Sequence, residues 1–235
     1  MQMTSTGLGL LLVAAAGCGM STGDDDTTNP PDPRPLVCPT EGRYFPMVEG
    51  ATWTFKVTDS DRNVADKISR VGAKEDVGGV KAGMMAFKVT TSTASGGTTE
   101  SWQEDTGSEI RRHRELDLSG ATHNEDVYQP FKLRLDESSA HTAAGAEWTL
   151  SYDEIHTNLS TQVTKTTAKT DRWTVEASDA EVVVPAGHYC ALQVRRTSTV
   201  GEDAGSDKTY WFVRGIGKVK EVGGSTEELA SFEIP

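Results

Sequence analysis

The sequence predicts an all-β protein in which curved antiparallel sheets form an open or closed barrel-like domain from two related halves. In many short segments, apolar residues alternate with polar ones, which is the pattern of a strand with one buried face. Threonine is abundant in these segments, and glycine pairs at 78–79 and 223–224 separate them as hairpin turns would. Helical periodicity is almost absent, and the one candidate helix, residues 108–118, fits a strand nearly as well.

The predicted strands follow one another along the chain. The first carries Trp53, Phe55 and Val57 on one face, and a later strand repeats this pattern with Trp148 and Leu150. Because one-faced alternation is typical of sheets with a packed and a hydrated side, we expect antiparallel pairing. In chain order, the predicted strands are 52–58, 86–93, 127–135, 148–152, 155–163, 171–177, 181–184, 190–199, 208–213 and 217–222.

The N-terminal residues predict a targeting segment. Residues 8–16 form a short apolar core of the length found in secretory signals. Small residues then precede Cys18, and this sequence resembles the bacterial lipobox, in which the cysteine is diacylated and becomes the first mature residue. We therefore expect a lipoprotein signal peptide at 1–17, a lipidated Cys18 with a flexible, acidic and proline-rich tether at 18–40, and a β-domain at 41–235.

Two features depart from the lipobox pattern. Residues 1–7 contain no Lys or Arg, and Ala15 stands where leucine is commonest. The alternative is an ordinary cleaved signal peptide with an incidental cysteine. The residue after Cys18 is Gly19. An aspartate at this position would resemble an inner-membrane retention signal, and the sequence lacks it. We therefore expect the acyl chains to anchor the domain to the bacterial outer membrane, facing the periplasm or the cell surface.

Charge and composition exclude other classes of protein. With 23 Lys+Arg against 35 Asp+Glu, the net charge is −12, which repels phosphate backbones, so we expect no nucleic-acid partner. No apolar stretch approaches the roughly 18–20 residues of a membrane-spanning helix, and we do not expect an integral membrane protein.

Two cysteines remain if Cys18 is lipidated. Cys38 and Cys190 would form an even pair in an oxidising compartment. A disulfide between them would close a long loop and stabilise the domain by roughly 4 kcal/mol in the chain-entropy model. The alternative is two independent thiols, because the sequence does not show that the two positions meet.

Three landmarks recur in the same order and predict an internal repeat. They are a glycine followed by a tryptophan strand, a Val-x-Ala-Gly motif before another strand, and a later tryptophan. The matched pairs are 50–55 with 145–150, 80–89 with 184–194, and Trp102 with Trp211. We therefore expect two related halves at about 44–120 and 140–235.

The second half also carries a resemblance. The motifs at 184–187, 210–212 and 215–220, together with the opening at 46–53, are similar to a pattern in uncharacterised bacterial secreted and lipoprotein β-domains. The similarity covers most of residues 44–222. It implies a curved antiparallel sheet or open barrel akin to lipoprotein carriers and lipocalin-like domains, and it supplies no catalytic residues.

The tryptophans are the candidate core or ligand-contacting side chains. Trp53, Trp102, Trp148 and Trp211 each lie on or near a predicted strand, where a large aromatic serves as a buried anchor or stacks on a ligand.

The sequence contains no recognisable catalytic or cofactor motif. The five histidines lack zinc-site spacing, and no nucleophile elbow, phosphate loop or dinucleotide fingerprint occurs, so we expect no catalytic residues, cofactor or metal. The preferred interpretation is a membrane-anchored, non-enzymatic binding or structural module for an envelope partner protein or an apolar ligand. The alternative is a secreted metal-dependent or acid/base hydrolase using His123, Glu125 and Asp126, with His113 as a further candidate.

Overall fold

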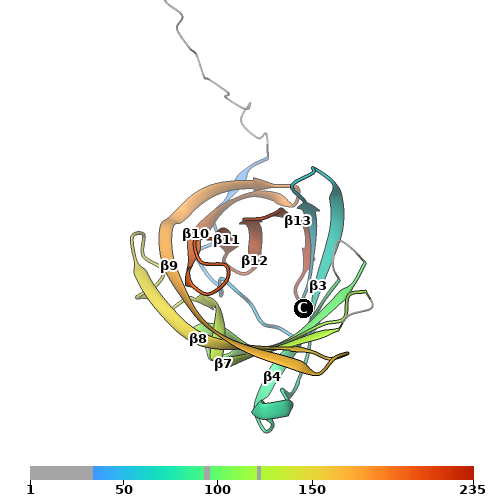
Figure 1. Cartoon of the computed structure of the whole chain (residues 1–235). Coiled ribbons are helices and arrows are strands. Elements are labelled where there is room, and N and C mark those ends of the chain that lie inside the picture. The colour runs from blue at the N-terminus through green and yellow to red at the C-terminus, as the bar shows by residue number, and fades with distance from the viewer. Residues whose placement is uncertain (1–33, 93–95, 121–122) are drawn as a thin grey trace, which may run out of the picture. The chain divides into compact units, whose positions relative to one another are not determined.

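The computed structural model describes residues 34–92, 96–120 and 123–235. The predicted signal peptide, Cys18 and most of the tether lie outside these residues. The described chain forms an antiparallel barrel of twelve strands with one short parallel strand added at its edge (Figure 1). In chain order, the elements are β1 (Leu36–Val37), β2 (Thr52–Thr58), β3 (Val64–Asp76), the 3-10 helix η1 (Gly79–Lys81), β4 (Met85–Ser92), β5 (Thr98–Asp105), β6 (Glu109–Asp117), β7 (Asn124–Asp136), β8 (Glu147–Asn158), β9 (Val163–Val184), β10 (Gly187–Val200), β11 (Asp207–Val213), β12 (Gly217–Val222) and β13 (Thr226–Glu233).

The strands follow one another around the barrel in the order of the chain. Each strand from β2 to β12 pairs with the next one, and the barrel closes where the last strand, β13, pairs with β2. Leu229 lies opposite Phe55 at this seam. The prediction of an all-β, barrel-like fold is confirmed, and the barrel is closed rather than open.

Several predicted elements differ from the structure. Residues 108–118 are strand β6 and not a helix, because β5 and β7 supply hydrogen-bond ladders on both sides. The segments at 171–177 and 181–184 belong to one long strand, β9. Leu159 lies in the turn after β8 rather than on a strand face. Strands β3, β5 and β13 were not predicted, because charged residues interrupt their alternation.

Residues 39–51 cross one end of the barrel before β2 begins (Figure 1). Arg43 accepts a hydrogen bond at its carbonyl from the Gly215 N–H (2.8 Å), and its guanidinium reaches Asp105 and Glu137. Tyr44 donates its N–H to a Glu137 oxygen (2.8 Å). This segment therefore contacts three separate turns and closes that end of the lumen as a plug, which we call the plug segment.

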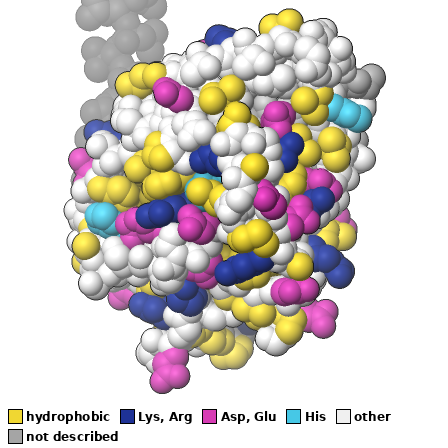
Figure 2. All heavy atoms as spheres, turned by 90° about the horizontal axis from the view of Figure 1, so that it is seen from below, with side chains coloured by type: hydrophobic (Ala, Val, Ile, Leu, Met, Phe, Trp, Pro, Cys, Tyr) yellow, Lys and Arg dark blue, Asp and Glu magenta, His cyan; other side chains and the backbone are white. Residues whose placement is uncertain are grey.

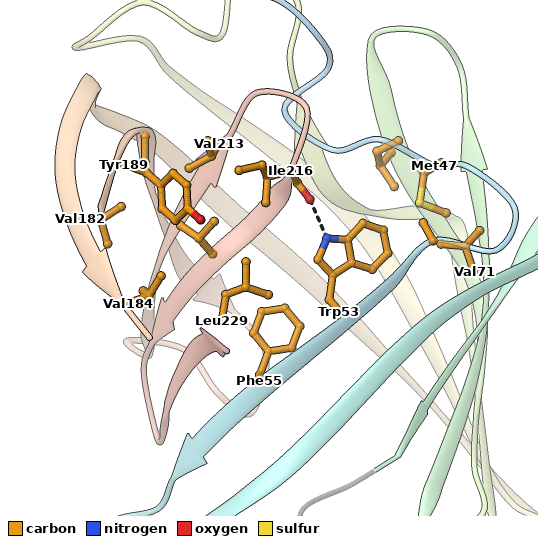
Figure 3. Packing of buried hydrophobic residues seen from close by; sticks show 14 of the residues in the cluster. Met47, Trp53, Phe55, Val71, Val182, Val184, Tyr189, Val213, Ile216 and Leu229 are labelled. Atoms are coloured by element: carbon orange, nitrogen blue, oxygen red, sulfur yellow. Dashed lines mark hydrogen bonds between the residues drawn. The ribbon is translucent and has the colours of Figure 1, made fainter. Parts of the chain in front are cut away.

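The far part of the β9–β10 hairpin forms a second layer against β11–β13. The Ala186 N–H bonds to the Leu229 carbonyl (2.9 Å), which ties the hairpin tip to β13. Val182, Val184 and Tyr189 pack in the same apolar cluster as Leu229, and Figure 3 shows them beside it. The barrel wall is thus covered on this side, and β1 pairs with the edge of this hairpin.

The repeated landmarks lie on strands that are six apart in the chain. Trp53 and Trp148 lie on β2 and β8, and Trp102 and Trp211 lie on β5 and β11. The glycines before the first pair have positive φ angles and matching bonds: Gly50 N–H donates to the Val71 carbonyl (2.9 Å), and Gly145 N–H to the Val175 carbonyl (2.8 Å). The predicted halves leave β7 outside both ranges, and duplication itself stays a prediction.

The outer face carries charges of both signs. Figure 2 shows Lys and Arg beside Asp and Glu on the side from which β4 and β7 are seen, with small apolar groups between them. Within the described residues, no helix has the length and apolar character needed to cross a membrane.

Candidate functional site

A cavity of about 380 Å³ lies inside the barrel between the plug segment and the charged part of the lumen. Its walls come from β2–β7 and β11–β13, whose side chains alternate between the lumen and the outer face. This volume falls near the lower end of the range of small-molecule pockets, about 300–1,000 Å³. The lumen is therefore the candidate binding site.

One side of the cavity is apolar and rigidly held. Phe45 and Met47 of the plug segment line it together with Trp53 and Phe55 of β2. The Trp53 indole N–H donates to the Ile216 carbonyl (2.6 Å), as Figure 3 shows, and the Phe45 ring meets Trp53 edge-on at 6.4 Å. A buried indole with its N–H bonded presents only its apolar surface to a ligand.

The opposite side holds a chain of ion pairs. Lys67 Nζ lies 2.6 Å from one oxygen of Glu227, whose other oxygen is 2.8 Å from Lys218 Nζ. Lys218 also contacts Glu221 at 2.5 Å, and Glu221 contacts Lys208 at 2.7 Å. Three lysines thus share two carboxylates along this wall.

The lysines keep the two carboxylates ionised. Burial acts to raise the pKa of Glu221, but the charges of Lys218 and Lys208 outweigh it and hold this pKa well below its ordinary value. The pKa of Glu227 is lowered in the same way, against burial, by Lys218 and Lys67. Burial and the charge of Lys218 lower the pKa of Lys67. The wall therefore holds its charges in a fixed arrangement at neutral pH.

Arg134 is the exception among the cavity's cations. Arg112 pairs with Glu115, whereas the Arg134 side chain has no hydrogen-bond or ion-pair partner in the described part of the chain. Burial, followed by the charge of Arg112, lowers the pKa of Arg134, although a guanidinium remains protonated. The Gln103 amide donates to Ser101 Oγ (2.8 Å), and its buried oxygen has no partner. The cavity thus presents an unused donor group and an unused acceptor.

A second polar network fills the rest of the lumen, on β7–β10. Lys132 lies over the Tyr128 ring at 5.0 Å and 3.8 Å from Glu154. Tyr152 donates its hydroxyl to Asp171 (3.3 Å), which faces Arg196 at 3.7 Å. Burial, followed by the charges of Arg196 and Arg112, lowers the pKa of Lys132 to about 8.

Known proteins offer little guidance. No protein-family model matches this chain, and no curated protein matches its sequence. A solved structure described as "a putative lipoprotein from Parabacteroides distasonis ATCC 8503" is similar at a TM-score of 0.39 and 10% sequence identity, over 81% of this chain and 98% of that chain. What the chain does therefore rests on its own geometry.

The four predicted tryptophans have different environments. Trp53 lines the cavity, and Trp148 stacks between His141 (4.0 Å) and Trp173 (6.2 Å) at the plugged end. Trp102 and Trp211 lie on the outer side of the wall, since Ser101 and Gln103 line the cavity and Phe212 packs against the lumenal Phe45. Only Trp53 is placed to contact a ligand in this cavity.

The residues of the hydrolase alternative are not brought together. Glu125 pairs with Arg114 (2.6 Å), whereas Asp126, on the other face of β7, pairs with His156 (2.7 Å). His123 is exposed and has no carboxylate partner among the described residues. Within those residues no group of three His, Cys, Asp or Glu side chains is arranged to hold a metal.

His113 belongs to a separate buried cluster outside the lumen. Its ring nitrogens lie 3.0 Å from a Glu104 oxygen and 3.2 Å from Lys81 Nζ. Burial lowers the pKa of His113, the hydrogen bond to the Glu104 carboxylate opposes this shift, and the charge of Lys81 lowers the pKa further. The cluster fastens η1 to β6 rather than joining His123.

Cys38 and Cys190 form a disulfide in the structure, with their Cα atoms 4.7 Å apart. The bond fixes the chain directly after β1 to strand β10. Cys18 lies outside the described residues, so its lipidation stays a prediction.

Sequence reasoning missed the charged residues of the cavity. Lys67 and Glu227 lie on β3 and β13, which were not predicted as strands, and Arg134 stands between two leucines. A charged residue in an alternating segment normally faces solvent, and nothing local distinguishes one that faces a polar lumen. Which charged residues face the lumen can be recognised only in the closed barrel.

Proposed function

We propose that this chain is a non-enzymatic envelope lipoprotein, anchored through Cys18, whose barrel binds a small ligand with an apolar body. The cavity of about 380 Å³ with its aromatic floor is the observation that supports this proposal. The sequence supports the anchor through its short apolar core and its lipobox-like cysteine. No arrangement of nucleophile, base and metal in the described residues favours a reaction in the lumen.

A variant that fills the cavity tests the proposal. Thr91 lines the cavity, and Thr90 precedes it on the opposite face of β4, so Thr91→Trp blocks the site and Thr90→Trp is the matched control. Titration of the full chain with decanol, followed by calorimetry and by intrinsic tryptophan fluorescence, is expected to give saturable one-to-one binding. We expect Thr91→Trp to weaken binding about tenfold or more, and Thr90→Trp to leave it unchanged.

Two results would overturn the binding proposal. One is the absence of saturable binding for every alkyl probe in the unmodified chain, which would leave an interaction with a partner protein. The other is equal affinity in Thr91→Trp and the unmodified chain, which would place the bound probe outside the cavity.

A further inference from the structure

We infer that the lumen recognises an anionic amphiphile, with Arg134 binding its charged head group and the aromatic floor contacting its alkyl body. This inference rests on the proposed function and names the chemical class of its ligand. It starts from the balance of charge in the cavity. Five cationic and three anionic side chains line it, although the whole chain carries a net charge of −12.

The surplus amounts to two positive charges, and Arg134 carries one of them. The three lysines on this wall share Glu221 and Glu227, which leaves one positive charge among them, and Arg112 pairs with Glu115. Arg134 lines the same cavity and forms no direct ion pair among the described residues, although the charges of Glu221 and Glu115 act on it from a longer distance. A buried charge without a direct counter-ion is unfavourable, so the site favours a ligand that supplies one.

The chemistry of Arg134 defines the head group. A guanidinium presents its N–H donors in a planar fork that matches a carboxylate or a phosphate in two parallel hydrogen bonds. The neighbouring Arg112 adds positive charge, as its effect on the Arg134 pKa shows. Gln103 offers a free buried acceptor on the same cavity, which suits a ligand that also carries a hydroxyl or N–H group.

The apolar lining defines the rest of the ligand. Phe45, Met47, Trp53, Phe55 and Val57 contribute to the same cavity as Arg134. A space of about 380 Å³ suits a single alkyl chain better than the two chains of a membrane phospholipid. Charge and shape together indicate a single-chain carboxylate or phosphate ester.

Four probes that share one alkyl chain length and differ in their head group show which head group the cavity prefers. We would titrate the full chain with decanoate, decyl phosphate, decanol and decyltrimethylammonium at fixed salt. The expected order of affinity has one of the two anions first, decanol at least about tenfold weaker and the cation weakest. Which anion binds more tightly distinguishes a fatty acid from a phosphate ester.

Substitution of Arg134 tests whether this residue binds the head group. Arg134→Met keeps an unbranched stem without the charge, and Arg70→Met makes the same change on an exposed arginine of β3. We expect Arg134→Met to weaken binding of the preferred anion at least about tenfold and to leave decanol binding unchanged. Arg70→Met should bind both as the unmodified chain does, and Arg134→Lys should restore part of the anion affinity.

The outcomes separate this inference from the proposed function. If decanol binds as tightly as both anions, or if Arg134→Met binds anions normally, the head-group assignment is overturned and the lumenal binding proposal stands. If no probe binds, both are overturned. An unfolding midpoint in urea as high as that of the unmodified chain shows that Arg134→Met has folded.

Discussion

Lys132 shows how a single side chain in the lumen affects stability. It is a half-buried cation whose ion pair with Glu154 is long, at 3.8 Å. Its pKa of about 8 means that the folded state holds the proton less tightly than the unfolded state does. Stability therefore rises with pH through the window from about 8 to the ordinary lysine value, where the unfolded chain binds more protons.

Replacing this lysine should stabilise the protein in a pH-dependent manner. Lys132→Met keeps the stem and removes the charge, so we expect a gain of about 1–3 kcal/mol in the free energy of unfolding at pH 7. The gain should shrink above pH 8 and nearly vanish near pH 11. Urea titrations across this range measure it, and a gain that does not change with pH would refute the explanation.

At this scale the sequence predicts apolar residues better than charged ones. Trp53, a predicted core or ligand aromatic, lies in the floor of the cavity, because a large apolar side chain on an alternating strand has only the interior to enter. Arg134 and Glu227 could not be placed, because their burial depends on the distant strands that close the lumen around them. The candidate site was therefore predictable in its floor and not in its polar wall.

The position of the plug segment also depends on residues from distant strands. Residues 39–51 have no regular secondary structure beyond turns and bends, yet they close one end of the barrel. Their position is set by Arg43, whose guanidinium lies 3.1 Å from Asp105 and 2.8 Å from Glu137. The Glu137 side chain is only 4% exposed, so it depends on this cation.

Removal of that cation should loosen the plug. We expect Arg43→Met to lower the free energy of unfolding by about 1–3 kcal/mol, because Glu137 loses its only cationic partner among the described residues. Arg70→Met is the matched control and should change stability by less than about 0.5 kcal/mol. Urea denaturation compares the three proteins. Equal losses in both variants would show that the ion pair does not hold the segment.

Strands were predicted where one-faced alternation is strong and missed where it is weak. The segment at 52–58 was predicted with its structural bounds. Strands β3 and β13 carry charged side chains toward the lumen, so their sequences do not show a regular alternation of apolar and polar residues. The helix suggested at 108–118 reflects its Glu- and Arg-rich sequence, which has good helix propensity and was overridden by pairing on both edges.

For the whole molecule, the disulfide ties the tether's end to the barrel. Cys38 and Cys190 are separated by 152 residues, so the bond constrains most of the unfolded chain. We expect Cys38→Ser with Cys190→Ser to lower the free energy of unfolding by about 2–4 kcal/mol.

The comparison needs oxidised and reduced samples of the unmodified chain. Reduction should bring its unfolding midpoint to that of the double variant and leave the variant itself unchanged. An unmodified chain whose midpoint does not respond to reductant would contradict a stabilising role for the bond.

The seam between β13 and β2 also imposes an order on synthesis and folding. The strand needed to close the barrel, β13, is the last one made, and its partner β2 is the first strand of the barrel itself. Pairing between such distant segments forms slowly, and until it forms the edges of β2 and β12 expose unpaired N–H and C=O groups. Until residues 226–233 pair with β2, the growing chain therefore presents two strand edges that can pair with other copies of itself.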